Sequence, residues 1–218
     1  MRLILVRHGE TGGNPSARLQ GRTDLSLSKI GRAQARAAGQ ALKVNALGRL
    51  VASDMKRARE TADIIAGCQA TPVPVVLDSR LREVDLGLWE GMTLDEVRRT
   101  SPGELEHWLG NPQATPPDGE PFADAGGRVS RFVTELLSSR VDTVAIVAHL
   151  LVFQVLICAL MGISPAARYP FHLYTGSLSE LRVEDGRRDG VRPASLVYLN
   201  RLSHLADAGL DVESIRDR

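Results

Sequence analysis

The sequence predicts an α/β protein, a three-layer sandwich in which helices flank a mainly parallel central sheet. Short apolar runs alternate with longer helix-like segments along most of the 218 residues. Strands that alternate with helices are typical of parallel sheets, whose strands are buried on both faces. Apolar residues make up 43% and charged residues 24% of the chain, as in globular proteins with a substantial core. No linker or internal repeat is visible, which predicts one domain over residues 1–218.

The individual elements follow from hydrophobic periodicity and from capping signals. The predicted strands are Arg2–Val6, Arg49–Ala52, Val73–Leu77, Thr143–Ala148, Leu178–Val183 and Ser195–Leu199. The predicted helices are Ser28–Lys43, Met55–Ala66, Phe122–Arg140, Leu150–Met161 and one that begins at the capping box Thr93–Glu96. Residues 92–121 are expected to form a lid, because they combine this short helix with the Pro-rich loop Asn111–Pro121.

Charge and cysteine usage narrow the class of protein. The net charge of +1 offers no global field to attract nucleic acid or an anionic membrane, so any anion must be bound by a local positive cluster. Cys68 and Cys158 cannot build a disulfide framework and show no metal-ligand spacing, which favours the cytoplasm. No signal peptide is expected. The apolar stretch Val144–Gly162 contains His149 and Gln154, and a buried strand that runs into a buried helix explains it better than a membrane span.

The first chemical motif, Arg7-His8-Gly9-Glu10-Thr11, follows directly after the first predicted strand. Ligands of parallel sheets bind at the carboxyl ends of strands. Gly9 lets the backbone approach a ligand closely, and the guanidinium fork of Arg7 matches phosphate oxygens. Asn14 could donate its amide to the same oxygens. His8 is therefore a candidate catalytic residue.

The second motif runs from Ser53 to Thr61 (SDMKRARET) after the strand Arg49–Ala52. Ser53 or Asp54 is expected to cap the next helix. Arg57 then falls in its first turn, where the positive helix end favours a bound anion.

Two further strand-end groups complete the candidate site. The segment Leu81–Gly91 carries carboxylates outside a helix, and Glu83 is the best candidate for a proton donor to a leaving group, with Asp85 as the fallback. His149 follows the strand Thr143–Ala148, the same kind of position that His8 occupies.

Taken together, these motifs resemble the histidine phosphatase superfamily, which includes cofactor-dependent phosphoglycerate mutases and their phosphatase relatives. The matching residues are RHGET with Asn14, LQG at 19–21, LS..G..QA at 27–35, SD..RA.ET at 53–61, LRE…G.WEG at 81–91 and VAH ending at His149. The resemblance covers about the first three quarters of the chain and implies the phosphoglycerate mutase-like fold.

The resemblance implies a phosphomonoesterase that works without a metal ion or another cofactor. His8 would attack phosphorus and carry the phosphoryl group, and Glu83 would protonate the leaving group and then activate water. Arg7, Asn14, Arg57, His149 and the N–H of Leu150 would hold the phosphoryl oxygens. Fixed donors suit the loose transition state of phosphoryl transfer, which spreads charge over three oxygens.

The sequence departs from the family pattern at two places. Leu150-Leu151 stands where Gly-Gly is usual, and Asp118-Gly119-Glu120-Pro121 stands where Gly-Gly-Glu-Ser is usual. Both changes bear on the substrate, for which phosphoserine, α-ribazole 5′-phosphate and phosphorylated sugars or glycerates are the candidates. Further substrate contacts are expected from the loop, from Trp108, and from the following residues: Gln20, Gly21, Trp89 and His204.

Two other functions stay open at this stage. A phosphoglycerate mutase would keep the phosphoryl group on His8, but this chain has no obvious room for the insertion that mutases carry after the acid motif. A catalytically silent phosphate-binding regulatory module would use the same pocket for recognition alone. The expected partner is a small phosphomonoester, with neither nucleic acid nor a membrane, and residues 169–174 with the late strands could form a homodimer.

Overall fold

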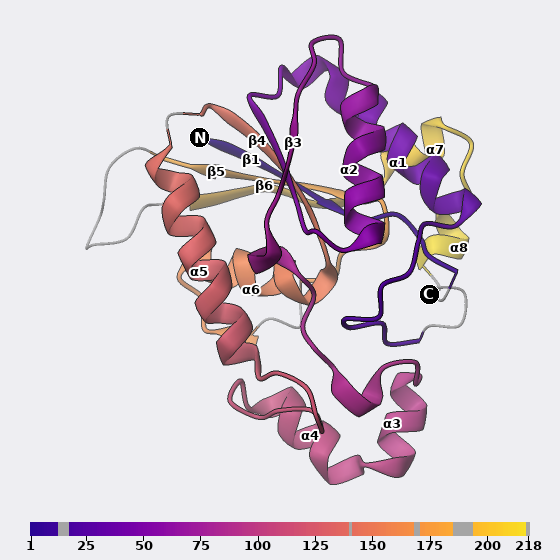
Figure 1. The fold of residues 1–218 in the computed structure, drawn as a ribbon, viewed down its shortest axis with the longest axis vertical. Coiled ribbons are helices and arrows are strands. Elements are labelled where there is room, and N and C mark those ends of the chain that lie inside the picture. The colour runs from indigo at the N-terminus through magenta and orange to yellow at the C-terminus, as the bar shows by residue number, and fades with distance from the viewer. Residues whose placement is uncertain (13–17, 140, 168–170, 185–193, 217–218) are drawn as a thin grey trace.

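The computed structural model of the protein describes residues 1–12, 18–139, 141–167, 171–184 and 194–216. Its centre is a six-stranded mixed sheet in the order β3-β2-β4-β1-β5-β6 (Figure 1). The strands are β1 (Arg2–Arg7), β2 (Arg49–Ala52), β3 (Val75–Leu77), β4 (Thr143–Ala148), β5 (Leu178–Val183) and β6 (Ala194–Arg201). Strands β1 to β4 are parallel to one another, whereas β5 is antiparallel to both of its neighbours, β1 and β6. The predicted mainly parallel α/β fold is confirmed.

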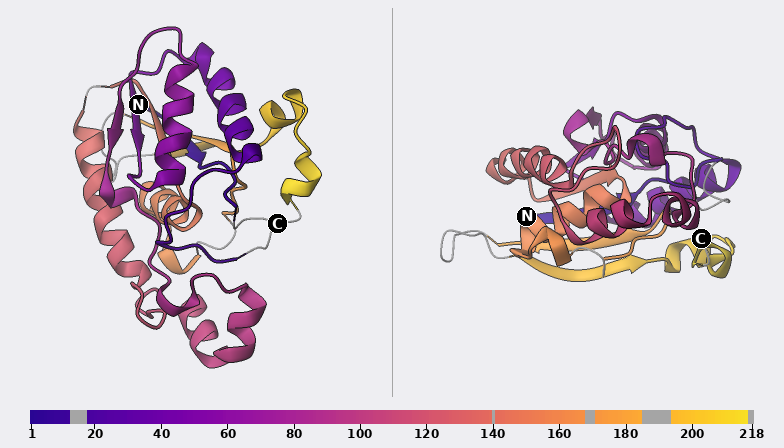
Figure 2. Two further views of the ribbon diagram at one scale, coloured as in Figure 1. Left: turned by 45° about the vertical axis from the view of Figure 1, so that its right-hand side comes forward. Right: turned by 90° about the horizontal axis from the view of Figure 1, so that it is seen from below.

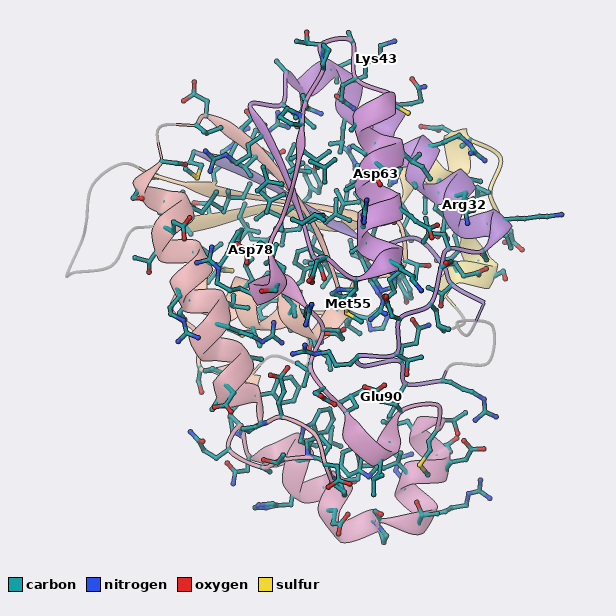
Figure 3. The ribbon with its side chains drawn as sticks, viewed as in Figure 1. Arg32, Lys43, Met55, Asp63, Asp78 and Glu90 are labelled. Atoms are coloured by element: carbon teal, nitrogen blue, oxygen red, sulfur yellow. The ribbon has the colours of Figure 1, made fainter. Side chains whose placement is uncertain are left out.

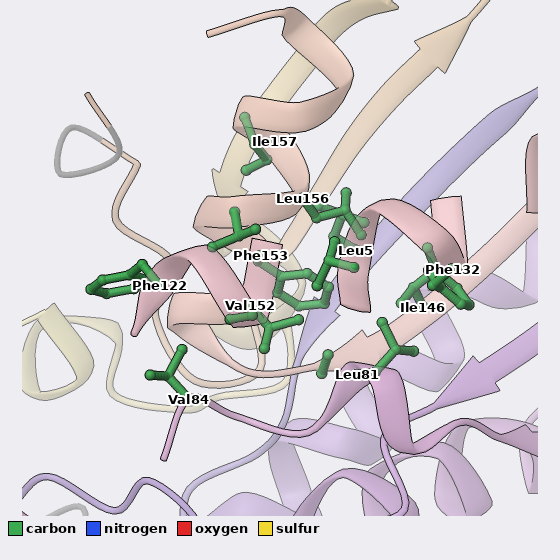
Figure 4. Packing of buried hydrophobic residues seen from close by; sticks show 14 of the residues in the cluster. Leu5, Leu81, Val84, Phe122, Phe132, Ile146, Val152, Phe153, Leu156 and Ile157 are labelled. Atoms are coloured by element: carbon green, nitrogen blue, oxygen red, sulfur yellow. The ribbon is translucent and has the colours of Figure 1, made fainter. Parts of the chain in front are cut away.

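Two helical layers cover the faces of this sheet. On one face, α1 (Lys29–Leu42) packs beside α2 (Lys56–Gly67), and on the other α5 (Phe122–Ser138) packs beside α6 (Leu150–Met161). The period-two alternation of strand side chains explains the layers, because Ile4 and Val6 join the cluster under α1 and α2. Leu3 and Leu5 point the other way, into the larger cluster with α5 and α6 (Figure 4).

The remaining helices lie at the borders of the sandwich. Helices α3 (Leu94–Thr100) and α4 (Pro102–Gly110) sit together beyond one end of the sheet, whereas α7 (Ser203–Asp207) lies against α1 (Figures 1 and 2). Short 3-10 turns cover Lys43–Asn45, Ser79–Leu81, Gly87–Trp89 and Pro165–Ala167, and α8 spans Val212–Arg216. No helix within the described ranges is long and apolar enough to cross a membrane.

Most of the predicted helices and strands are present, and some begin or end a residue or two from the predicted position. The helix predicted for Phe122–Arg140 ends at Ser138, and β3 begins at Val75 rather than Val73. The predicted capping box is present, since Thr93 accepts from the N–H of Glu96 and the Glu96 carboxylate accepts from the N–H of Thr93. The 92–121 segment contains two helices, because Pro102 starts a second one.

Candidate active site

Two buried histidines meet at the carboxyl ends of neighbouring strands. Strands β1 and β4 are paired in parallel with Arg7 opposite Ala148, so the next residues, His8 and His149, leave the sheet side by side. Their ring centroids are 5.0 Å apart, and the exposed fractions of the two residues are 4% and 0%. The sheet register therefore sets the spacing of this pair.

The hydrogen bonds of the two rings determine where their protons sit. Nδ1 of His8 lies 2.8 Å from the carbonyl oxygen of Gly9, which can only accept, so Nδ1 carries the proton and Nε2 carries a lone pair. Nε2 of His149 lies 2.9 Å from Oγ of Ser53. An imidazole with a lone pair on Nε2 is the form in which His8 can act as a nucleophile.

Arg57 joins the two rings. It lies in the first turn of α2, is 1% exposed, and donates its Nε–H to Nε2 of His8 and to Nδ1 of His149, each over 3.2 Å. Its two terminal nitrogens donate to the carbonyl oxygens of Gly21 and Thr23 over 2.8 Å each. A planar fork held at both ends by fixed acceptors is a rigid donor for an anion.

The loop that holds Arg57 is itself tied down by Glu90. The Glu90 carboxylate accepts from the N–H of Thr23 over 2.9 Å and also from the N–H of Arg22. Gly21 has a φ of +47°, and a Cβ there would lie 2.1 Å from Oε1 of Glu90, so only glycine fits. Figure 3 labels Glu90 and also Met55, which precedes α2.

The electrostatics keep both imidazoles neutral. Burial, with the nearby positive charge of Arg57, holds the pKa values of His8 and His149 well below the usual 6.5. Burial also lowers the pKa of Arg7 to about 10, which leaves its guanidinium charged at neutral pH. One terminal N–H of Arg7 donates to the carbonyl oxygen of Leu173, and its buried Nε has no partner among the described residues. This guanidinium can still donate to an anion.

Glu83 occupies the N-terminus of α6 beside the histidines. Its carboxylate accepts from the N–H groups of Leu151 and Val152 over 3.2 Å each and from its neighbour Val84 over 3.0 Å. The residue is 7% exposed, and burial raises its pKa despite these donors and the nearby arginines. A carboxyl group with a raised pKa keeps its proton to a higher pH than an ordinary glutamate, which suits general acid catalysis. Asp85, the fallback, instead caps the N–H of Gly87.

Most of these groups line one cavity of about 350 Å³, whereas His149 is not among its lining residues. Its floor is formed by the ionisable residues Arg7, His8, Arg57 and Glu83. Its walls come from other parts of the chain: Arg18, Leu19, Gln20, Gly21, Leu86, Leu94, Trp108, Leu109, Leu150, Leu151, Gln154 and His172. Among the described residues, no three His, Cys, Asp or Glu side chains are grouped so that they could hold a metal ion.

Not every predicted substrate contact lies at this cavity. Gln20, Gly21 and Trp108 line it, whereas Asn14 falls outside the described residues. Trp89 is 2% exposed and packs edge-on against Trp108 in the core, 5.5 Å between centroids, and it is not part of the cavity wall.

His204 and the Pro-rich loop also lie away from the cavity. His204 borders a separate open cavity between α1 and α7, and its Nε2 lies 2.9 Å from the carbonyl oxygen of Gly176. Glu120 of the Asp118–Pro121 segment has a structural position, since its carboxylate accepts from Arg128 over 2.7 Å and from the N–H of Asp85 over 3.1 Å. The loop packs against the acid segment instead of lining the cavity.

The prediction that Ser53 or Asp54 caps α2 is wrong. The N-cap position is Met55, which makes no side-chain cap, and the carboxylate of Asp24 accepts from the N–H of Lys56 over 2.7 Å. Ser53 instead bonds His149. Asp24 comes from a loop distant in sequence, and no local pattern pointed to it.

Sequence reasoning also missed three residues of the site. Gln154 and His172 line the cavity, and Thr61 connects the first two motifs by accepting from the N–H of Gly9 while donating to the carbonyl of Arg57. Thr61 belongs to the second motif, but the sequence alone does not show that it connects this motif to the first. Gln154 lies in an apolar helix, where a lone polar residue was the available signal.

A buried histidine with a lone pair on Nε2, the buried Arg57, the partly buried Arg7 and a buried carboxyl group meet near the ends of parallel strands. This arrangement defines a phosphoryl-transfer enzyme of the α/β class. The sequence profile of the histidine phosphatase superfamily, branch 1, matches residues 3–194. The chain belongs to this superfamily, and its prediction as a phosphoric monoester hydrolase is confirmed.

Three similar proteins show the range of the family around this chain. Glucosyl-3-phosphoglycerate phosphatase of Mycolicibacterium vanbaalenii is 37% identical over 78% of this chain and 77% of its own length. Phosphoserine phosphatase 1 of Hydrogenobacter thermophilus is 32% identical over 95% of each chain. The structure of the α-ribazole phosphatase from Shigella flexneri superposes with a TM-score of 0.79 and 27% identity, covering 92% of this chain and 96% of that one.

Proposed function

We propose that the protein hydrolyses a small phosphomonoester through a phosphohistidine at His8, without the help of a metal ion. The observation that carries this proposal is the proton arrangement of His8. Gly9 O holds the proton on Nδ1, so the lone pair of Nε2 lies at the cavity, where Arg57 also donates.

In the first step, Nε2 of His8 attacks phosphorus and the bond from phosphorus to the ester oxygen breaks. The protonated Glu83 gives its proton to that oxygen, so the product leaves as a neutral alcohol rather than an alkoxide. Arg7 and Arg57 hold the equatorial oxygens, and Asn14 and the N–H of Leu150 are assigned to the same task. His149, whose Nδ1 accepts from Arg57, takes up a proton from the solvent when the dianion binds, donates it to a phosphoryl oxygen, and returns it to the solvent when orthophosphate leaves.

In the second step, the Glu83 carboxylate takes a proton from a water molecule, which attacks the phosphohistidine. The phosphorus–nitrogen bond breaks, orthophosphate leaves, and Nε2 regains its lone pair. Glu83 thereby returns to its protonated form. Each step balances in atoms and charge without an external reagent.

Metal independence is supported by the charges that the chain itself supplies. Arg7 and Arg57 bring two fixed positive charges to the floor of the cavity, and both are largely desolvated. Preorganised donors in a low-dielectric site can supply the stabilisation that a metal ion gives in other phosphoryl-transfer enzymes.

The names of the relatives narrow the class of substrate that this chain is proposed to hydrolyse. Their names assign them to glucosyl-3-phosphoglycerate, phosphoserine and α-ribazole phosphate, all of which are small phosphorylated metabolites. A substrate of this size fits a cavity of about 350 Å³ that holds the alcohol beside the phosphate site. The cytoplasm stays the predicted location and a homodimer the predicted assembly.

The decisive experiment measures phosphate release from phosphoserine, α-ribazole 5′-phosphate and a sugar phosphate in EDTA, with His8→Ala beside the wild type. The proposal expects turnover that survives EDTA and is abolished in His8→Ala. Rapid acid-free quenching with ³²P-labelled substrate should trap a phosphoenzyme that is stable to base and labile to acid.

Two outcomes would point to the alternatives. Stoichiometric labelling of His8 without turnover would indicate the silent regulatory module. Transfer of the label to a second phosphoglycerate, in preference to water, would indicate a mutase.

A further inference from the structure

The wall of the cavity opposite the phosphate site is apolar. Leu150 and Leu151 of α6 stand at its edge in place of a glycine pair, and Leu94, Trp108 and Leu109 of the α3–α4 pair line it from the other side. These side chains come from three helices, α3, α4 and α6. An alcohol held here contacts hydrocarbon over most of its surface.

Each positively charged side chain of the described cavity wall already has an ion-pair partner or a proposed role at the phosphate site. Arg7 and Arg57 face the phosphate site, and the third arginine, Arg18, forms an ion pair with Glu96 at 2.9 Å and donates to the carbonyl of Gly91 over 2.7 Å. His172 is neutral at pH 7, because partial burial and the charge of Arg7 lower its pKa. A second anionic group on a substrate would therefore share the cavity with Glu83, and the described part of the wall offers it no unpaired cation.

The side-chain oxygen of Gln154 has no hydrogen-bond partner among the described residues. Gln154 is 4% exposed and lines the cavity. Its Nε2 donates to the carbonyl of Phe171 over 3.0 Å, which fixes the orientation of the amide, because a carbonyl oxygen can only accept. Oε1 is buried and accepts no hydrogen bond from the described chain. Buried acceptors of this kind are usually satisfied, so a ligand donor fits here.

We infer that the alcohol released by this enzyme is uncharged and largely apolar, and that it carries a hydrogen-bond donor that Oε1 of Gln154 accepts. This inference rests on the proposed phosphatase function and names its substrate class. Among the substrates that the relatives' names give, α-ribazole phosphate releases an uncharged alcohol with an aromatic ring. Phosphoserine and glucosyl-3-phosphoglycerate both carry a carboxylate, for which the described part of the wall offers no unpaired cation.

The test uses three phosphate esters that differ at one position: 2-phenylethyl phosphate and its para-hydroxy and para-carboxy derivatives. The inference expects kcat/KM to rise about tenfold from the parent to the hydroxy ester and to fall about tenfold for the carboxy ester. The rise corresponds to one hydrogen bond gained by the hydroxy ester, and the fall corresponds to one carboxylate held without a cation. Phosphoserine is measured alongside and should be hydrolysed more slowly than the parent.

Two variants assign these effects to residues. Gln154→Leu should remove the advantage of the hydroxy ester over the parent. Glu96→Gln keeps a capping-box side chain but frees Arg18, so the ratio of carboxy ester to parent should rise severalfold.

Either of two results overturns the inference. One is a higher kcat/KM for phosphoserine or the carboxy ester than for the parent in the wild type. The other is a hydroxy-ester advantage that persists in Gln154→Leu. If no ester releases phosphate at all, the proposed phosphatase function itself fails, which is a distinguishable result.

Discussion

Nε of Arg57 donates to Nε2 of His8 over 3.2 Å, so the arginine proposed to bind phosphate contacts the nitrogen proposed as the nucleophile. In the substrate-free protein this contact occupies the lone pair and holds the ring in place. An incoming phosphoryl group must insert between the two side chains, where its oxygens replace the imidazole as acceptors. Binding and activation of the nucleophile are therefore the same event.

Arg57→Lys is expected to lower kcat/KM by about 10²- to 10³-fold, the usual loss when one fixed oxyanion donor is removed. A lysine ammonium cannot reach both imidazoles and the carbonyl oxygens of Gly21 and Thr23 at once. Steady-state kinetics with the best ester of the panel measures the loss.

The matched control for this prediction is Arg59→Lys. Arg59 lies on the same helix, is exposed and makes only a 3.8 Å ion pair with Asp63, so its replacement should change kcat/KM less than twofold. Equal losses in both variants would contradict the role assigned to Arg57.

The pH dependence of kcat/KM should show an optimum on the acid side of neutrality. His8 must be neutral to attack, and its pKa lies well below 6.5, so activity persists as the pH falls through 6.5. Glu83 must be protonated to donate, and its pKa is raised, so activity falls as the pH rises through that raised pKa. A profile measured from pH 4 to 9 checks both limbs, and an optimum above pH 8 would be incompatible with Glu83 as the acid.

Glu83→Gln separates proton donation from binding. The variant should lose about 10²- to 10⁴-fold in kcat/KM with an alkyl phosphate, whose alkoxide needs a proton, and much less with 4-nitrophenyl phosphate, whose anion leaves unaided. The alkaline limb of the pH profile should also disappear. Asp85→Asn is the control, because Asp85 only caps the N–H of Gly87; equal sensitivity of the two esters in Glu83→Gln would refute the assignment.

Gly31→Ala should destabilise the protein and disturb the site together. A Cβ on Gly31 would lie 2.0 Å from the carbonyl oxygen of Glu10, so the strand-end loop that carries His8 must shift. We expect a loss of about 1–3 kcal/mol in the free energy of unfolding, the usual cost of overpacking. Chemical denaturation and kcat/KM on the same preparation measure both effects.

Gly67→Ala serves as the stability control. Gly67 ends α2 with open space around its Cβ position, so alanine should leave stability unchanged or raise it by up to about 1 kcal/mol through helix propensity. A larger loss for Gly67→Ala than for Gly31→Ala would show that the contact with Glu10 does not limit the structure.

Much of this site could be predicted because each of its main side chains follows a recognisable element. His8 and His149 come one residue after buried apolar strands, and Arg57 comes in the first turn of a helix. The carboxyl ends of parallel strands share one edge of the sheet, so these residues had to lie close together.

The parts that could not be predicted depend on contacts between distant segments. Trp89 and His204 have residue types suited to a pocket, but a sequence does not show which way a side chain points, and both face elsewhere. Asp24 caps α2 from a separate loop, and Gln154 gains its importance only because Phe171 fixes its amide. Such relations appear only when the tertiary structure is known.

The parallel pairing of β1 with β4 has a consequence for how the chain acquires its activity. Arg57 and His149 are separated by 92 residues in the sequence. Strand β1 can pair with β4 only after β4 has been synthesised. Contacts of such long range form slowly, since the closure of a long loop costs entropy before any contact is gained. A nascent chain that has exposed the whole RHGET motif thus still lacks the proposed phosphate site, which also needs His149 at the end of β4.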